Sequence, residues 1–171
     1  MRCFRLVIAM LLVVVGCDGS AGSTVDATIA DAGEPACPVS ADGCNIVVGT
    51  IGGESLVVTA ACPNFGAFNQ RVRLTNYLVD SSCVATMAVG PDDRALDLEW
   101  LGIDPPTFNA SRWYPTGPSG GVGGEATEGT AVMDVWDVAS NRMRGAFDLH
   151  FGSDRVCGCF DAVAEVRSRS R

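Results

Sequence analysis

Hydrophobic and polar residues alternate most regularly in the last third of the chain, where three strands are predicted. A period of two is typical of a half-buried antiparallel strand. Along 142–151 one face would carry Met143, Gly145, Phe147, Leu149 and Phe151, and the other Arg142, Arg144, Asp148 and His150. Apolar runs over Ala131–Asp137 and Arg155–Val166 flank this segment, with turn residues between. The pattern therefore predicts a three-stranded meander.

Shorter apolar runs upstream predict further strands, and helical periodicity is nearly absent. Leu96, Leu98 and Trp100 alternate with more polar neighbours. The other predicted strands are Ile46–Thr50, Ser55–Ala60, Arg71–Val79 and Cys83–Val89. Twenty glycines and eight prolines supply frequent turns. This pattern favours an all-β fold, either an antiparallel β-sandwich or a small barrel, and the sequence leaves both open.

The short pattern Gly-x-Phe-Asp occurs twice near the end of the chain, at 145–148 and 158–161. The repeats place Phe147 and Phe160 on the two arms of the last predicted hairpin. Because both rings lie on the apolar side of their strands, we expect both to belong to the hydrophobic core.

The first sixteen residues contain the parts of an export signal. Arg2 and Arg5 form a positive head, Leu6–Val15 an apolar middle, and Gly16 supplies a small residue before a cleavage point. Ten apolar residues at about 1.5 Å each cover only about half of a ~30 Å hydrocarbon core. A cleaved signal is therefore favoured over a retained transmembrane helix.

The residues Val14-Val15-Gly16-Cys17 resemble the lipobox of bacterial lipoproteins. The resemblance implies that the Cys17 thiol receives a diacylglyceryl group, that the chain is cut before it, and that the new amine is acylated, with fatty acids such as palmitate. Two or three acyl chains anchor a protein stably. The alternative is an ordinary secretory signal, which bulky Val14 does not suit. Asp18 resembles an inner-membrane retention signal of some bacteria, so the outer membrane and the periplasmic face of the inner membrane both remain open.

Four regions are predicted along the chain. The signal covers 1–16; Cys17 and a flexible tether rich in Gly, Ala, Ser, Thr and Asp cover 17–36; a β-domain covers 37–166; and a basic tail covers 167–171. Without the signal, ten of the twelve arginines face twenty acidic residues. An acidic surface disfavours nucleic acid as a partner. The tail is expected to be solvated, with an electrostatic contact to an envelope polymer as the alternative.

Six cysteines follow the tether, and in an oxidising compartment they predict three disulfides. They are Cys37, Cys44, Cys62, Cys83, Cys157 and Cys159. Cys157 and Cys159 would share one face of a strand, about 6.6 Å apart, which disfavours a bond between them. We therefore predict that Cys62 pairs with Cys83, and that Cys157 and Cys159 hold Cys37 and Cys44 in either order. The spacings do not suit a structural zinc site or a redox motif.

Gly117-Pro118-Ser119-Gly120-Gly121 matches the Gly-x-Ser-x-Gly pattern of serine hydrolases. The chain order of Ser119, an aspartate (Asp134, Asp137 or Asp148) and His150 follows that of α/β-hydrolases. A nucleophile elbow, however, needs a strand before the serine and a helix after it, whereas glycines and prolines predict a loop here. We expect no catalytic residue, and a small secreted serine-type hydrolase is the alternative.

Ligand-binding candidates are few. Asp92 with Asp93, or Glu125 with Glu128, could contribute oxygen ligands to calcium, but no EF-hand-like register appears. No metal or other cofactor is predicted. The adjacent aromatics Trp113 and Tyr114 would point to opposite sides of an extended segment, so one of them could meet a sugar or a partner protein.

The predicted meander, with its strands Arg-x-Arg-Gly-x-Phe-Asp and Arg-x-Cys-Gly-x-Phe-Asp after a Gly-rich loop, resembles a group of myxobacterial-type lipoproteins of unknown function. The resemblance covers the last forty residues or so and the turn at Ile51-Gly52-Gly53, and it implies a fold but no chemistry. We therefore expect a lipid-anchored protein of the bacterial cell envelope, with a non-catalytic β-domain that contacts envelope proteins or glycans.

Overall fold

The computed structural model describes residues 35–80, 82–87, 90–102, 106–115 and 121–164, and the signal, Cys17, the tether and the basic tail lie outside these ranges. The strands are β1 (Ile46–Gly49), β2 (Ala60–Phe65), β3 (Asn69–Thr75), β4 (Ala95–Leu101), β5 (Thr107–Tyr114), β6 (Gly124–Glu125), β7 (Glu128–Asp137), β8 (Arg142–Phe151) and β9 (Asp154–Val163). In the described ranges, no helix has the length and apolar character needed to cross a bilayer.

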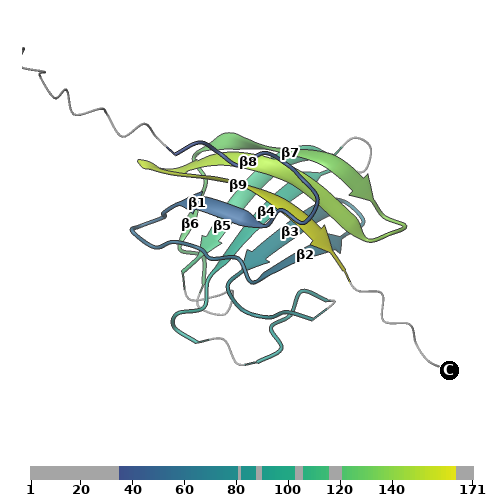
Figure 1. The fold of residues 1–171 in the computed structure, drawn as a ribbon, viewed down its shortest axis with the longest axis horizontal. Coiled ribbons are helices and arrows are strands. Elements are labelled where there is room, and N and C mark those ends of the chain that lie inside the picture. The colour runs from purple at the N-terminus through teal and green to yellow at the C-terminus, as the bar shows by residue number, and fades with distance from the viewer. Residues whose placement is uncertain (1–34, 81, 88–89, 103–105, 116–120, 165–171) are drawn as a thin grey trace, which may run out of the picture. The chain divides into compact units, whose positions relative to one another are not determined.

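The strands form two antiparallel sheets, which confirms the predicted all-β fold (Figure 1). One sheet has four strands in the order β1-β9-β8-β7, and the other has five in the order β2-β3-β4-β5-β6. The described domain is therefore β-sandwich-like. The predicted meander forms the greater part of the four-stranded sheet, because β7, β8 and β9 pair as consecutive neighbours.

The hydrophobic core lies between the two sheets. The four-stranded sheet supplies Met143, Phe147, Leu149, Val156, Phe160 and Ala162, and the five-stranded sheet supplies Val72, Leu74, Leu96, Leu98, Trp100 and Trp113. Trp100 links the two layers, because its ring centroid lies 5.7 Å from that of Phe160 and its indole nitrogen donates a hydrogen bond to the Ala131 carbonyl (3.3 Å). The expected core positions of Phe147 and Phe160 are confirmed, at 3% and 0% exposure.

Two predicted strands are wrong. Residues 55–58 of the predicted strand Ser55–Ala60 lie outside any strand, although Leu56 is buried; its side chain reaches the core without a strand around it. In the predicted strand Cys83–Val89, only Ala85 forms a β-bridge within the described residues, with Val79. Cys83 has a φ of 61°, which a strand does not accommodate.

Three other strands differ from the predictions at their bounds or were not predicted. The predicted strand Arg71–Val79 is displaced, because β3 ends at Thr75. β2 begins at Ala60 and continues through Pro63, which is tolerated because β2 is an edge strand. β5 was not predicted, since Asn109, Ser111 and Arg112 interrupt its apolar residues.

Candidate functional site

Two disulfides fasten the start of the domain across the outer face of the four-stranded sheet. Cys37 is bonded to Cys157 and Cys44 to Cys159, with Cα–Cα distances of 5.5 and 5.7 Å. We call the segment 37–45 the strap. The structure thus confirms the predicted partners and decides their order. The strap explains why Cys157 and Cys159 are 3% and 0% exposed although they point away from the core.

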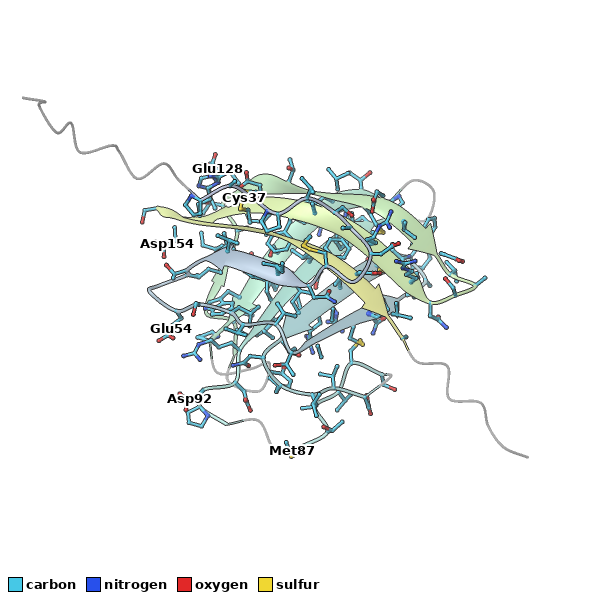
Figure 2. The ribbon with its side chains drawn as sticks, viewed as in Figure 1. Cys37, Glu54, Met87, Asp92, Glu128 and Asp154 are labelled. Atoms are coloured by element: carbon cyan, nitrogen blue, oxygen red, sulfur yellow. A yellow bond between two sulfur atoms is a disulfide. The ribbon has the colours of Figure 1, made fainter. Side chains whose placement is uncertain are left out.

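The third predicted disulfide is also confirmed. Cys62 is bonded to Cys83 with a Cα–Cα distance of 5.6 Å. It ties β2 to the long segment between β3 and β4, and Figure 2 shows Met87 at the outer end of that segment, far from the strap. Met87 is 73% exposed.

Beneath the strap, ion pairs hold it to the sheet in addition to the disulfides. The Asp42 carboxylate pairs with Arg142 (2.6 Å) and also with Arg144. Hydrogen bonds from Arg142 and Arg144 lower the pKa of Asp42 below its ordinary value. Ser40 donates a hydrogen bond to Asp134 of β7 (3.0 Å). The strap therefore leaves β9 at Cys37, reaches the edge strand β7 at Ser40, and returns over β8 to β9 at Cys44.

The two motif repeats are joined by reciprocal ion pairs on this outer face. Arg142, three residues before Gly145, bonds Asp161 through two hydrogen bonds of 2.8 Å. Arg155, three residues before Gly158, bonds Asp148 in the same way at 2.8 and 2.7 Å. These bonds lower the pKa of Asp161 and of Asp148 below the ordinary range.

Beside the strap, the outer face of β7 and β8 is hollowed into two adjoining depressions, which we call the strap groove. One, of about 320 Å³, is lined by Cys37, Pro38, Val39, Ser40, Thr130, Val132, Ala146, Phe147 and Asp148. The other, of about 310 Å³, is lined by Glu128, Gly129, Thr130, Asp148 and His150. They share Thr130 and Asp148. Figure 2 labels Cys37 and Glu128 close to the same upper edge of the four-stranded sheet.

The two ends of the strap groove differ in chemistry. At the apolar end, Val39 is 78% and Val132 is 65% exposed. At the polar end, Glu128 lies opposite His150 in the β7–β8 ladder, and Arg155 lies opposite His150 in the β8–β9 ladder. The groove was not predicted from the sequence, although one signal was present: Val132 is an apolar residue on the polar face of its strand.

The residues of the hydrolase alternative are only partly described. Ser119 lies outside the described residues. Asp148 is held by Arg155, Asp134 by Arg144 (3.0 Å), and Asp137 by the hydroxyl of Ser140 (2.6 Å). Each aspartate of the predicted set therefore has a partner other than His150.

The aromatic pair lies at the end of β5, and its side chains point to opposite faces. Trp113 is 3% exposed and belongs to the core. Tyr114 is half-buried, and the Arg73 guanidinium carbon lies 5.7 Å from its ring centroid. Burial raises the pKa of the Tyr114 hydroxyl. Of the two candidate ligand contacts, Tyr114 is the one with accessible surface.

The calcium candidates have different surroundings. The Asp93 carboxylate accepts a hydrogen bond from the Gly90 amide (2.6 Å), Glu125 pairs with Arg112 (2.8 Å), and Glu128 lines the strap groove. In the part of the chain that the structure describes, no three acidic, histidine or cysteine side chains come together as metal ligands.

The arginines of the described domain are paired with carboxylates. Each of the seven arginines between 71 and 155 forms an ion pair with a carboxylate: Arg71, Arg73, Arg94, Arg112, Arg142, Arg144 and Arg155. Several carboxylates, Glu128 among them, are not in these pairs. The described surface therefore keeps carboxylates that no arginine neutralises.

Comparison of the chain with protein-family models, with curated proteins and with solved structures gives no match.

Proposed function

We propose that this chain is an exported bacterial lipoprotein, anchored to an envelope membrane through Cys17, and that its β-sandwich-like domain is a non-catalytic module for contacts with envelope proteins or glycans. The anchor rests on the resemblance of Val14-Val15-Gly16-Cys17 to a lipobox. The domain supplies a rigid body at the end of a tether. We also propose that the chain is related to the myxobacterial-type lipoproteins that its meander resembles.

The observation that carries the proposal is the pairing of all six cysteines after the tether. The disulfides are Cys37–Cys157, Cys44–Cys159 and Cys62–Cys83. Disulfides form and persist in oxidising compartments such as the bacterial periplasm and cell surface, and they are rare in the cytosol. This supports export, which a lipobox requires.

The anchor is tested by metabolic labelling in a bacterium with two membranes. Cells that express the full chain are grown with an alkyne fatty acid, and the mature protein is analysed by mass spectrometry. We expect the label on a chain that begins at Cys17. The Cys17→Ala variant should lose the label and leave the membrane fraction. Cys3→Ala is the matched control, since Cys3 lies in the signal; it should behave as wild type. An unlabelled wild-type chain would overturn the anchor.

The hydrolase alternative is tested on the same purified protein. We expect turnover of p-nitrophenyl acetate to equal that of buffer, with no change in the Ser119→Ala and His150→Ala variants. Turnover that both substitutions abolish would favour the hydrolase.

A further inference from the structure

The strap groove has the form of a binding site with two chemically distinct ends. We infer that it binds an extended peptide segment of a partner protein, with an aliphatic side chain against Val39 and Val132 and a basic side chain beside Glu128. The inference deepens the contact role proposed above and rests on it.

The first argument is the placement of apolar surface. Val39 on the strap and Val132 on β7 line the same depression and are 78% and 65% exposed. The strap is fixed on both sides of Val39, by the Cys37–Cys157 disulfide and by the hydrogen bond from Ser40 to Asp134. The two valines therefore present a preorganised apolar surface. Because the strap is already fixed, binding of a side chain here would cost little conformational entropy.

The second argument is charge. The polar depression contains Glu128, which is not among the carboxylates in the arginine ion pairs described above. The neighbouring Asp148 is neutralised by Arg155. An incoming lysine or arginine would therefore meet an available carboxylate, whereas an incoming carboxylate would be repelled.

Two other occupants fit less well. Sugars commonly stack on exposed flat rings, but the phenyl ring that lines the groove belongs to Phe147, which is 3% exposed. A second copy of this chain carries the same acidic excess, and each described arginine already has a carboxylate partner. A basic segment of another protein needs no exposed ring, and it carries the positive charge that a second copy does not offer.

The geometry also sets the spacing of the ligand. The outer face of β7 carries every second residue of the strand, which here are Glu128, Thr130 and Val132. At about 3.3 Å per residue, Glu128 and Val132 lie about 13 Å apart along the strand. An extended ligand that satisfies both ends would therefore carry its aliphatic and basic residues four positions apart.

The test uses the full-length, detergent-solubilised protein and a random synthetic heptapeptide library, with bound peptides sequenced by mass spectrometry. We expect enrichment of peptides with an aliphatic residue and a Lys or Arg four positions apart. In Val132→Ser and in Glu128→Gln this enrichment should fall by about fivefold or more. Val57→Ser and Asp92→Asn, at exposed positions outside the groove lining, are the matched controls and should retain it.

Each result of this selection decides the inference. No enrichment, enrichment of acidic or aromatic peptides, or an equal loss in the control variants would overturn it. The result is distinguishable from failure of the anchor, because fatty-acid labelling of Cys17 and peptide selection are measured separately. An unlabelled chain that still selects basic peptides refutes the anchor alone.

Discussion

Gly145 lies directly opposite Phe160 in the antiparallel β8–β9 ladder, and Gly158 lies opposite Phe147 in the same way. A Cβ atom placed on Gly145 would come within 2.7 Å of the Phe160 ring, and one on Gly158 within 2.8 Å of the Phe147 ring. Each glycine of the repeated Gly-x-Phe-Asp pattern thus makes room for the ring of the other copy. The pattern is explained as mutual packing across one hairpin.

We predict that Gly145→Ala destabilises the domain by about 1–3 kcal/mol, because the added methyl group forces the Phe160 ring or the Val132 carbonyl to move. The measurement is the urea midpoint of the purified protein. Gly90→Ala is the control, since its Cβ would lie 3.7 Å from the nearest atom and no positive φ is required there. Equal midpoints for the two variants would contradict this account.

The two strap disulfides are predicted to act non-additively. Each alone closes a loop of 120 or 115 residues, but when one is intact the other closes only a ring of about ten residues through the strap and β9. Loop entropy then gives a loss of about 2–3 kcal/mol for Cys37→Ala/Cys157→Ala, and about 7 kcal/mol when both pairs are removed.

Denaturant titrations of the two double variants and the quadruple variant measure this coupling. The Cys62→Ala/Cys83→Ala variant is the reference for an independent disulfide, with a sequence separation of 21. If the quadruple variant loses only the sum of the two double variants, the nested-loop explanation fails.

Asp97→Ala is predicted to cost about 3–5 kcal/mol. The Asp97 carboxylate is fully buried on the outer face of the five-stranded sheet, where it accepts two hydrogen bonds from Arg73 (2.7 and 2.6 Å). The substitution leaves the half-buried Arg73 guanidinium without that partner. Glu125→Gln, which removes an exposed partner of Arg112, should cost less than about 1 kcal/mol. Similar losses of unfolding free energy in the two variants would refute the distinction.

Stability is predicted to fall in acid partly through Asp161. Hydrogen bonds from Arg142 depress its pKa in the folded state below the ordinary value of 3.8. A depressed carboxyl pKa stabilises the fold above the unfolded pKa, and this stability disappears as the pH falls through the folded pKa. The gap in unfolding free energy between wild type and Asp161→Asn should therefore narrow below about pH 4.

Urea midpoints at neutral pH and at several values below pH 4 provide the measurement. Val57→Ser, an exposed substitution without a titrating group, should follow wild type at every pH. A gap for Asp161→Asn that stays constant down to pH 2 would rule out this contribution.

The alternation of residues along the chain was sufficient to predict β8 and its two faces, because a strand with one buried side has a period of two in any tertiary context. It was insufficient for β2 and β5. Pro63 is tolerated only because β2 is at a sheet edge. Ser111 is 1% exposed in the folded protein, where it lies opposite Leu98 of β4 and alternates with buried Trp113 along β5.

The sequence by itself determined the all-β class, the meander, the Cys62–Cys83 pair and the set of four cysteines that hold the strap, since local spacing and strand geometry limit which cysteines can meet. Only the tertiary structure decided the order Cys37–Cys157 and Cys44–Cys159, the path of the strap over β8, and the groove beside it. These depend on which strands become neighbours, and strand pairing joins residues more than a hundred positions apart that carry no local signal of each other.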